Sequence, residues 1–111
     1  MSQRFQSITV DLAKLRDYCL SDTHPRGRHK ARVFRARLGL TSADAEFFRD
    51  TLIKAVESHA DSLAPTDSDE YGQRYVLDFD MTTSNGTAVI RSAWIVLVGE
   101  DVLRLVTCYV L

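Results

Sequence analysis

The residues of this sequence that could do chemistry gather in one short stretch, where histidines lie beside cations. His24 and His29 are interspersed with Arg26, Arg28 and Lys30. An imidazole exchanges a proton near neutral pH, and guanidinium and ammonium groups bind phosphate oxygens. Metal-independent RNA cleavage needs such groups: one His takes the 2′-hydroxyl proton, a cation stabilises the phosphorane, and a second acid protonates the leaving oxygen. The stretch therefore predicts phosphate binding, with histidines for proton transfer.

A simpler interpretation of the same stretch stays open, because charged side chains mostly lie in solvent without further function. His59, predicted near the end of a later helix, is interpreted as a cation that complements the helix dipole. The histidines have no supporting Cys or carboxylate at ligand spacing, so no metal site is predicted and no cofactor is expected. The sequence also lacks a glycine-rich phosphate loop and a serine nucleophile motif.

Further polar residues interrupt the apolar strands predicted in the C-terminal third. Arg91 must either pair with Asp78 or Asp80 or line a cleft, because a buried charge needs a partner. Thr107 and Tyr109 share one face of the final strand, where both are ordinary strand formers. An enzyme would need one of the histidines within reach of Arg91 or Thr107 across one concave site.

Helical spacing predicts three helices in the first half of the chain. They are expected from Asp11 to about Leu20, from Arg28 to Gly39, and from Thr41 to about His59. Thr41 and Asp44 resemble a capping box at the start of the third helix. Turn formers and Pro25 predict a loop over residues 21–27, which is the first candidate functional loop.

Strand signals follow in the second half. Three strands are predicted from the alternation over Tyr75 to Met81 and from apolar runs over 87–98 and 102–110, with a turn at Asn85-Gly86 between the first two. The middle strand is expected to be the central one of the sheet. Residues 61–72, with a proline, two serines and four acids, predict a solvated loop. The prediction is a single α+β domain over residues 1–111, with three N-terminal helices packed on a C-terminal three-stranded antiparallel meander.

Charge is unevenly distributed along the chain, although the net charge is only −1. Six cations and no acid occur from His24 to Arg37, and acids crowd residues 44–70. One hypothesis is a small RNA- or phosphate-directed protein, in which Arg26, Lys30 and Arg91 bind phosphate. The alternative is a non-catalytic interaction module, such as an immunity or accessory protein, whose acidic helix and loop contact a basic partner. A last strand at the sheet edge would favour a homodimer.

Two expectations concern the compartment and the cysteines. The apolar run from Ala93 to Val98 is far shorter than the roughly 20 residues of a membrane span, and the start from Met1 to Phe5 lacks a signal-peptide core. We therefore expect a cytoplasmic protein that contacts no membrane. Cys19 and Cys108 occur in apolar patterns and are expected to be buried free thiols.

Two motifs resemble those of a small uncharacterised bacterial family. Residues 24–39 fit the pattern HPxGxxKAxxFxxxLG, and residues 104–109 fit the closing pattern RLVTxY. The resemblance extends over nearly the whole chain. It names a family without implying an activity.

At longer range, helices that carry basic or histidine residues, followed by a sheet whose last strand ends in T-x-Y, are similar to toxin ribonucleases of the barnase, EndoU, colicin and RelE type. This resemblance implies a metal-independent ribonuclease of toxin-like ancestry. The implied catalytic positions are His24, His29 or Lys30 from the helical half, with Arg91 and Thr107 from the sheet.

Overall fold

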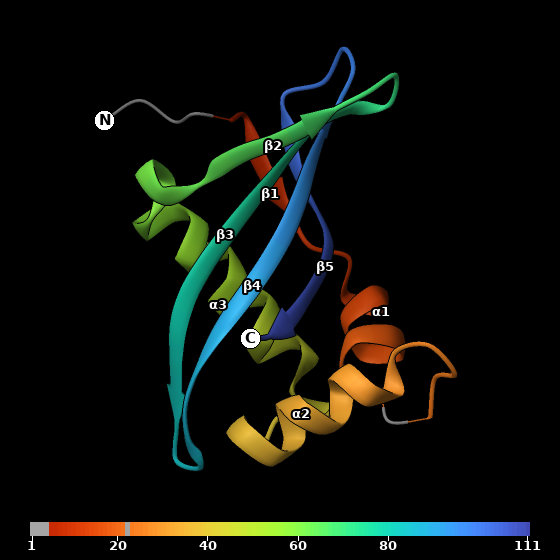
Figure 1. The fold of residues 1–111 in the computed structure, drawn as a ribbon, viewed down its shortest axis with the longest axis vertical. Helices are drawn as coiled ribbons and strands as arrows, with labels where there is room; N and C mark the ends of the chain where they lie inside the picture. The colour runs from red at the N-terminus through yellow and green to blue at the C-terminus, as the bar shows by residue number, and fades with distance from the viewer. Residues whose placement is uncertain (1–4, 22) are drawn as a thin grey trace.

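The structure, a computed structural model, describes residues 5–21 and 23–111 and is shown in Figure 1. Its elements in chain order are β1 (Ser7–Thr9), α1 (Leu12–Lys14), the π-helix η1 (Leu15–Cys19), α2 (Arg28–Leu38), the 3₁₀ helix η2 (Ser42–Asp44), α3 (Ala45–Ser58), the 3₁₀ helix η3 (Ala60–Ser62), β2 (Ala64–Ser68), β3 (Gly72–Thr83), β4 (Gly86–Leu97) and β5 (Val102–Val110). Helices lie mostly in the N-terminal half and the long strands in the C-terminal half, which confirms the α+β class.

The predicted three-stranded meander is wrong, because the sheet has five strands in the order β1-β5-β4-β3-β2. β3, β4 and β5 do pair antiparallel, with Arg91 between Asp78 and Tyr109 in the register. β1 adds a strand parallel to β5, and β2 adds one antiparallel to β3, so the sheet is mixed. β4 is the middle strand, as its two apolar faces predict.

The two strands that sequence reasoning missed are short strands at the two edges of the sheet. β2 lies inside the predicted loop over residues 61–72, and all five of its residues are exposed. Because neither of its faces is buried, it needs no apolar alternation, and an edge position tolerates Pro65. β1 has three residues, Ser7–Thr9, which is too short for a period of two to be recognised.

The helix ends follow the caps that the sequence predicts. The first helical segment ends close to Leu20 as expected, although only α1 is α-helical and the rest is the π-helix η1. The Asp11 side chain accepts hydrogen bonds from two backbone N–H groups at its start. α2 ends at Gly39, whose φ of 71° is readily adopted only by glycine. The capping box of Thr41 and Asp44 is present before α3.

One face of the sheet is covered by helices and the other is open. α3 passes behind the long strands in Figure 1, and α2 lies to the lower right of them, next to β4 and β5. Leu77 and Trp94 are buried on the covered face, whereas Asp78 and Arg91 reach the open face. Ser92 donates a hydrogen bond to the Leu77 carbonyl and accepts one from the Trp94 indole, each at 2.8 Å. The Ser92 hydroxyl and the Trp94 indole N–H are therefore both satisfied, and Trp94 is a core residue.

The remaining expectations concern the cysteines, a membrane-spanning segment and the N-terminal residues. Cys19 and Cys108 are free and buried, as predicted. Among the described residues, no helix has both the length and the apolar character needed to cross a membrane. Residues Met1 to Arg4, which the signal-peptide expectation concerns, and Asp22 in the predicted loop lie outside the described residues.

Candidate phosphate-binding face

His24 holds together the loop that leads into α2. Its Nδ1 accepts hydrogen bonds from the backbone N–H groups of Arg26 and Gly27, at 3.0 and 3.1 Å. The half-buried ring packs edge-on against Tyr18, with 4.6 Å between the ring centroids. Because the Nδ1 lone pair is used in the loop, the hydrogen-bond network assigns the neutral ring's proton to Nε2. His24 can therefore donate a hydrogen bond from Nε2.

Gly27 brings this loop into close contact with η1. A Cβ atom at this position would lie 2.3 Å from the carbonyl oxygen of Tyr18. Its φ of −88° suits any residue, so the glycine is required by the close approach of two backbones. The N–H of Arg28 bonds to the His24 carbonyl at 3.0 Å immediately afterwards. The loop therefore fixes where α2 begins relative to η1.

The first turn of α2 divides its polar side chains between the sheet and solvent. Lys30 is half-buried, and its Nζ lies 4.9 Å from the ring centroid of Tyr109 on β5. This distance is within the range of a cation–π interaction. Arg28 and His29 are exposed on the same turn, and Arg26 is exposed in the loop. Lys30 is thus the predicted cation that reaches the sheet.

Arg91 and Asp78 form a two-pronged ion pair on the open face of the sheet. The two hydrogen bonds measure 2.9 and 2.8 Å, which selects Asp78 over Asp80 as the partner. Hydrogen bonding to Asp78 and then to Tyr109 raises the pKa of Arg91, and the Arg91 guanidinium lowers the pKa of Asp78. A row of four side chains therefore runs from β3 to α2: Asp78, Arg91, Tyr109 and Lys30.

Thr107 lies on the same strand as Tyr109, but its hydroxyl is buried. Its Oγ1 has no hydrogen-bond partner among the described residues. Hydrogen bonding to Cys108 lowers the pKa of Cys19 to about 7 against the opposing effect of burial, and the Thr107 hydroxyl lies close to the Cys19 thiol. Hydrogen bonding to Cys19 and burial raise the pKa of Cys108. Thr107 thus belongs to a cluster of buried thiols, and the structure does not present its hydroxyl to solvent.

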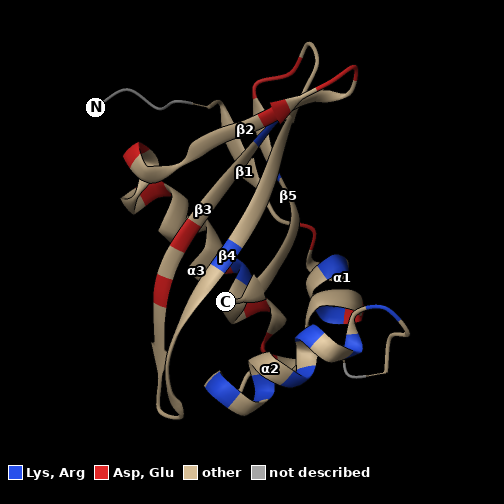
Figure 2. Cartoon of the chain, viewed as in Figure 1, with Lys and Arg blue, Asp and Glu red and all other residues tan. Residues whose placement is uncertain are grey.

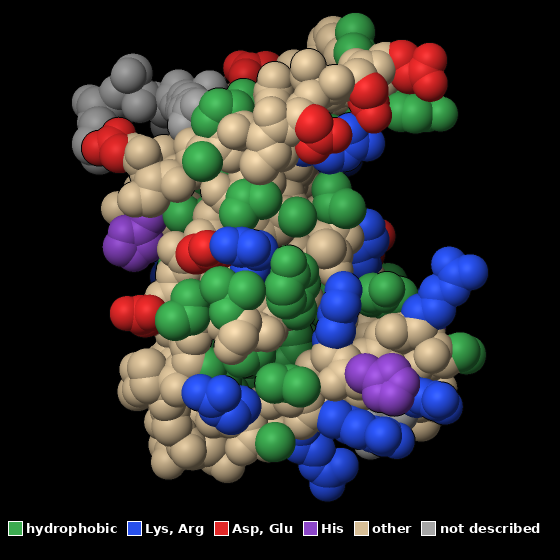
Figure 3. Space-filling model, in the orientation of Figure 1, with side chains coloured by type: hydrophobic (Ala, Val, Ile, Leu, Met, Phe, Trp, Pro, Cys, Tyr) green, Lys and Arg blue, Asp and Glu red, His purple; other side chains and the backbone are tan. Residues whose placement is uncertain are grey.

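Cations concentrate at one end of the molecule. Figure 2 shows Lys and Arg on α1, α2 and the loop between them, and many of the Asp and Glu residues near the opposite end of the sheet. Figure 3 shows basic side chains and a histidine beside an apolar strip on the open sheet face. Tyr109, interpreted from sequence as a strand former only, joins Lys30 to Arg91. The feature of the sequence that could have marked Tyr109 as a site residue was its position in the closing RLVTxY pattern.

Comparisons with known proteins give a family but no activity. Within residues 5–21 and 23–111, no group of three or more His, Cys, Asp or Glu side chains is placed to hold a metal ion. No curated protein and no solved structure matches the chain, and these comparisons show no similarity to toxin ribonucleases. A family model described as "Domain of unknown function (DUF6883)" matches residues 2–111, which include both sequence motifs. The chain therefore belongs to the DUF6883 family.

Proposed function

We propose that this protein binds RNA through its phosphates, on a surface that we call the basic face. The basic face consists of Arg26, Arg28, His29, Lys30, Arg91 and Tyr109. One contact carries the proposal: Lys30 over the Tyr109 ring joins the cationic start of α2 to the open face of the sheet. Cations beside an aromatic ring and an uncovered strand surface are the combination that binds single-stranded nucleic acid without sequence preference.

The helix side of the basic face supplies the attraction for phosphate. Arg26 and Arg28 are exposed, and the guanidinium fork matches two phosphate oxygens. Lys30 is held over Tyr109, so less side-chain freedom is lost when it meets a phosphate. Each phosphate that is neutralised releases counterions, so the affinity should fall steeply as salt rises.

The sheet side of the basic face supplies a surface for the bases. Val89 is 39% exposed on the open face, two residues before Arg91, and the half-exposed Tyr109 lies opposite Arg91 on the next strand. Arg91 contributes less to the attraction, since a phosphate must compete with Asp78 for its guanidinium. We therefore assign Arg91 to orienting the RNA, and Arg26, Arg28 and Lys30 to binding it.

A metal-independent ribonuclease is the narrower form of this proposal, and it rests on His29. His29 is exposed on the turn that carries Lys30, whereas Nδ1 of His24 is already used by the loop. In this form the 2′-oxygen attacks the phosphorus while His29 takes its proton, Lys30 stabilises the charge that develops on the phosphate, and the bond to the 5′-oxygen breaks as that oxygen takes a proton from water. His24 would donate a hydrogen bond from Nε2 to a phosphate oxygen.

Binding is tested by fluorescence anisotropy with a labelled, mixed-sequence single-stranded RNA in EDTA. Lys30→Gln should weaken binding by about fivefold, because one phosphate contact and its counterion release are lost. Lys54→Gln is the matched control, since Lys54 is an exposed lysine on α3. Equal affinities of the two variants, or no salt-dependent binding by the wild type, would refute the proposal.

Cleavage is tested on the same RNA by denaturing gel. His29→Ala should abolish any metal-independent cleavage by the wild type, and His59→Ala should not, because His59 lies exposed at the end of α3. Binding without cleavage would refute the ribonuclease form and leave the RNA-binding proposal standing.

A second candidate function, a protein interaction module, is favoured by the opposite end of the sheet. Tyr71 and Val98 are 63% and 70% exposed there, and the Val98 N–H bonds to the Tyr71 carbonyl at 3.0 Å. Acids flank both residues in the sequence: Asp69, Glu70, Glu100 and Asp101. Exposed apolar groups among acids suit a basic protein partner.

This candidate is separated from RNA binding by a paired substitution. Tyr71→Ser with Val98→Ser should abolish co-purification of a basic protein partner from host cells and leave RNA affinity unchanged. Phe47→Ser is the control, since Phe47 is 57% exposed on α3. A basic partner lost equally from both variants, or from neither, would exclude this end of the sheet as the interface.

A further inference from the structure

The open face of the sheet carries an apolar strip that the described helices leave uncovered. Val76 on β3 pairs in the register with Ala93 on β4, and Ile95 follows two residues along β4. Residues two apart share one face of a strand, so Ala93, Ile95 and the 39% exposed Val89 lie on the face of Arg91. We call Val76, Val89, Ala93 and Ile95 the apolar strip, which runs along the face that Figure 3 shows.

The two ends of this face carry opposite charge. Arg26 and Arg28 are exposed at one end, and Glu70 and Asp101 are exposed at the other. None of the four forms an ion pair within residues 5–21 and 23–111. Figure 2 shows the two groups at opposite ends of the molecule, and Figure 3 shows basic and acidic side chains at the two ends of the open face. The face therefore has an apolar middle between a positive and a negative end.

The face is large enough for a specific contact with another protein. Figure 1 views the molecule down its shortest axis, and the other two extents, 37 and 30 Å, outline an area of about 1,100 Å². A standard interface buries about 800 Å² on each partner. Tyr71 and Val98 add apolar surface at the acidic end, where they are 63% and 70% exposed.

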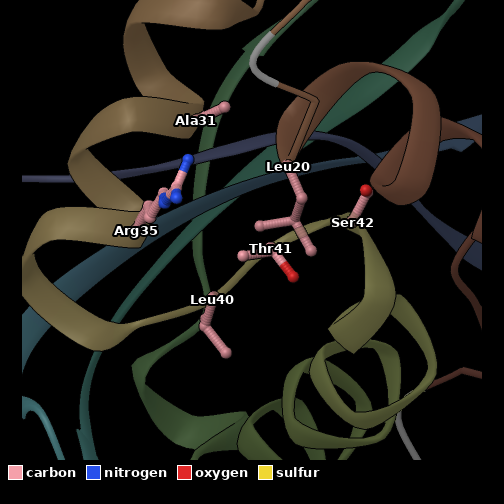
Figure 4. A pocket seen from close by; sticks show the side chains of 6 residues that line it. All are labelled: Leu20, Ala31, Arg35, Leu40, Thr41 and Ser42. Carbon is pink, nitrogen blue, oxygen red and sulfur yellow. The ribbon is translucent and has the colours of Figure 1, made fainter.

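The pocket drawn in Figure 4 belongs to another part of the surface. Its lining residues come from the end of η1 to the start of η2, and no residue of the apolar strip is among them: Leu20, Ala31, Arg35, Leu40, Thr41 and Ser42. Arg35, the cation in this lining, already has an interaction within the chain. The pocket therefore adds no contact to the open face, whose partner must be matched by the strip and its two charged ends.

We propose that the open face binds the same face of a second copy of this chain, with the basic end of each copy on the acidic end of the other. A two-fold axis that crosses the strands brings the two apolar strips together, and both pairs of ends then meet because each copy makes the same contact. A two-fold axis along the strands would instead place like charges together, which repel. The two sheets pack as the layers of a β-sandwich, about 10 Å apart.

This inference rests on the second candidate function, in which the acidic end contacts a basic partner, and it identifies that partner as the basic end of a second copy. RNA is not needed for the contact. Because Arg26, Arg28 and Val89 belong to both surfaces, RNA and the second copy exclude each other. We expect a dissociation constant on the order of 10 µM for the dimer, so RNA binding at lower protein concentrations involves the monomer.

The first experiment is sedimentation velocity of the full chain without RNA, from about 1 to about 200 µM. In about 50 mM salt, the mass should rise with concentration from 12.5 kDa toward twice that value. In about 500 mM salt, the dissociation constant should rise by about tenfold, because the contacts between charged ends are screened. A chain that stays monomeric throughout overturns the proposal.

The arrangement of the two copies is tested by exchanging the charges of the ends. Arg26→Glu with Arg28→Glu, and separately Glu70→Lys with Asp101→Lys, should each weaken self-association by at least about tenfold, because like charges then meet. An equal mixture of the two variants should form a heterodimer as tight as the wild-type dimer, since both pairs of ends are again opposite in charge. A mixture that stays monomeric overturns the arrangement.

Two further variants separate the effect of the ends from that of net charge and of the strip. Arg49→Glu with Lys54→Glu makes the same change in net charge on α3, behind the sheet, and should leave the dimer unchanged. Val89→Lys places a charge in the apolar strip and should prevent dimerisation, whereas Phe47→Lys, at a 57% exposed site on α3, should not. Equal effects of Val89→Lys and Phe47→Lys would overturn the role of the strip.

The failure of this inference differs from the failure of the function on which it rests. If the chain is monomeric but co-purifies a basic protein through Tyr71 and Val98, the interaction module stands and the dimer is refuted. If neither a dimer nor a basic partner is found, both are refuted. Dissociation of the dimer by single-stranded RNA supports the shared surface, and RNA that binds the intact dimer overturns it.

Discussion

At the end of the sheet near the turns of residues 69–71 and 98–101, carboxylates form hydrogen bonds and ion pairs with neighbouring residues of the same turns. Asp69 accepts hydrogen bonds from the N–H groups of Tyr71 and Gly72 and pairs with Arg74 at 2.7 Å. Arg104 pairs there with Glu100 at 3.1 Å. Asp69 and Glu100 thus stabilise two tight turns, and their negative charges are paired with cations of the same fold.

The cations of α2 are arranged in the opposite way. Arg26, Arg28 and Arg32 are exposed and form no ion pair with any carboxylate of residues 5–21 and 23–111. The loop before them is held by a histidine and a glycine, neither of which uses a charged side chain. The acidic end therefore uses charge to fold, whereas Arg26, Arg28 and Arg32 at the basic end form no such pairs within the described residues.

The largest expected effect is on stability, and it is tested by replacing one glycine at each end of the molecule. Gly27→Ala should lower the free energy of unfolding by about 3 kcal/mol, because its Cβ would meet the Tyr18 carbonyl at 2.3 Å. Gly99→Ala should cost only about 1 kcal/mol, since its φ is +82° but nothing lies within 4 Å. Urea denaturation measures both values. Equal losses would show that the basic loop is not set by this close contact.

Sequence reasoning found the parts of the fold that carry a periodic pattern. α2, its end at Gly39 and the strand over residues 102–110 occur as predicted, because burial on one side imposes spacing on the residues. β2 has no buried face and β1 is a parallel pairing over three residues, so neither leaves a local signal. The size of the sheet therefore depends on long-range pairing that a single sequence does not encode visibly.

The sequence identifies which residues could form the candidate site, but it does not show which of them are in contact. His24, Lys30 and Arg91 stand out as polar groups in a loop, a helix and an apolar strand. Their contacts depend on tertiary packing: the Nδ1 of His24 turns inward to the loop, and Lys30 meets Tyr109 across 79 positions of the chain. Tyr109 was passed over because a tyrosine in a strand is common.

The next largest effect is on RNA affinity. Arg26→Glu with Arg28→Glu should weaken binding by about 30-fold, since two exposed cations of the basic face become repulsive. Glu70→Lys with Asp101→Lys should change it by no more than about twofold at physiological salt, because charges beyond the Debye length of about 8 Å are screened and the molecule is 37 Å long. A large gain from the second pair would mean that RNA extends to the acidic end.

A smaller effect tests the loop at the basic end. His24→Ala should destabilise the fold by about 1–2 kcal/mol, because two backbone N–H groups lose their acceptor. His24→Asn should restore part of this loss, since a short side-chain oxygen can accept from N–H groups two and three residues on. His59→Ala, at an exposed site, serves as the control and should lie within about 0.5 kcal/mol of the wild type. Failure of Asn to rescue would argue that the ring's packing on Tyr18 matters more than Nδ1.

The smallest effect lies at the acidic end and depends on pH. Hydrogen bonding to Arg74, and then to the Tyr71 N–H, lowers the pKa of Asp69 from its usual 3.8. A carboxylate whose pKa is lower in the folded state stabilises the fold above its unfolded pKa, and this stabilisation is lost as pH falls through the folded pKa. Asp69→Asn should therefore lower the Tm at pH 7 by no more than about 4 °C, since the pair is partly exposed and screened. The gap between wild type and variant should close as the pH is lowered below 3.8.

Thermal unfolding followed by circular dichroism over this pH range measures the gap. Asp80→Asn is the matched control, because Asp80 is exposed on the open face and forms no ion pair with the described residues. A gap that stays constant with pH would mean that Asp69 acts only as a neutral hydrogen-bond acceptor. In that case the charge of Asp69 would not contribute to folding. The acids at this end would then differ from the cations of α2 only in where they lie, and not in how their charge is used.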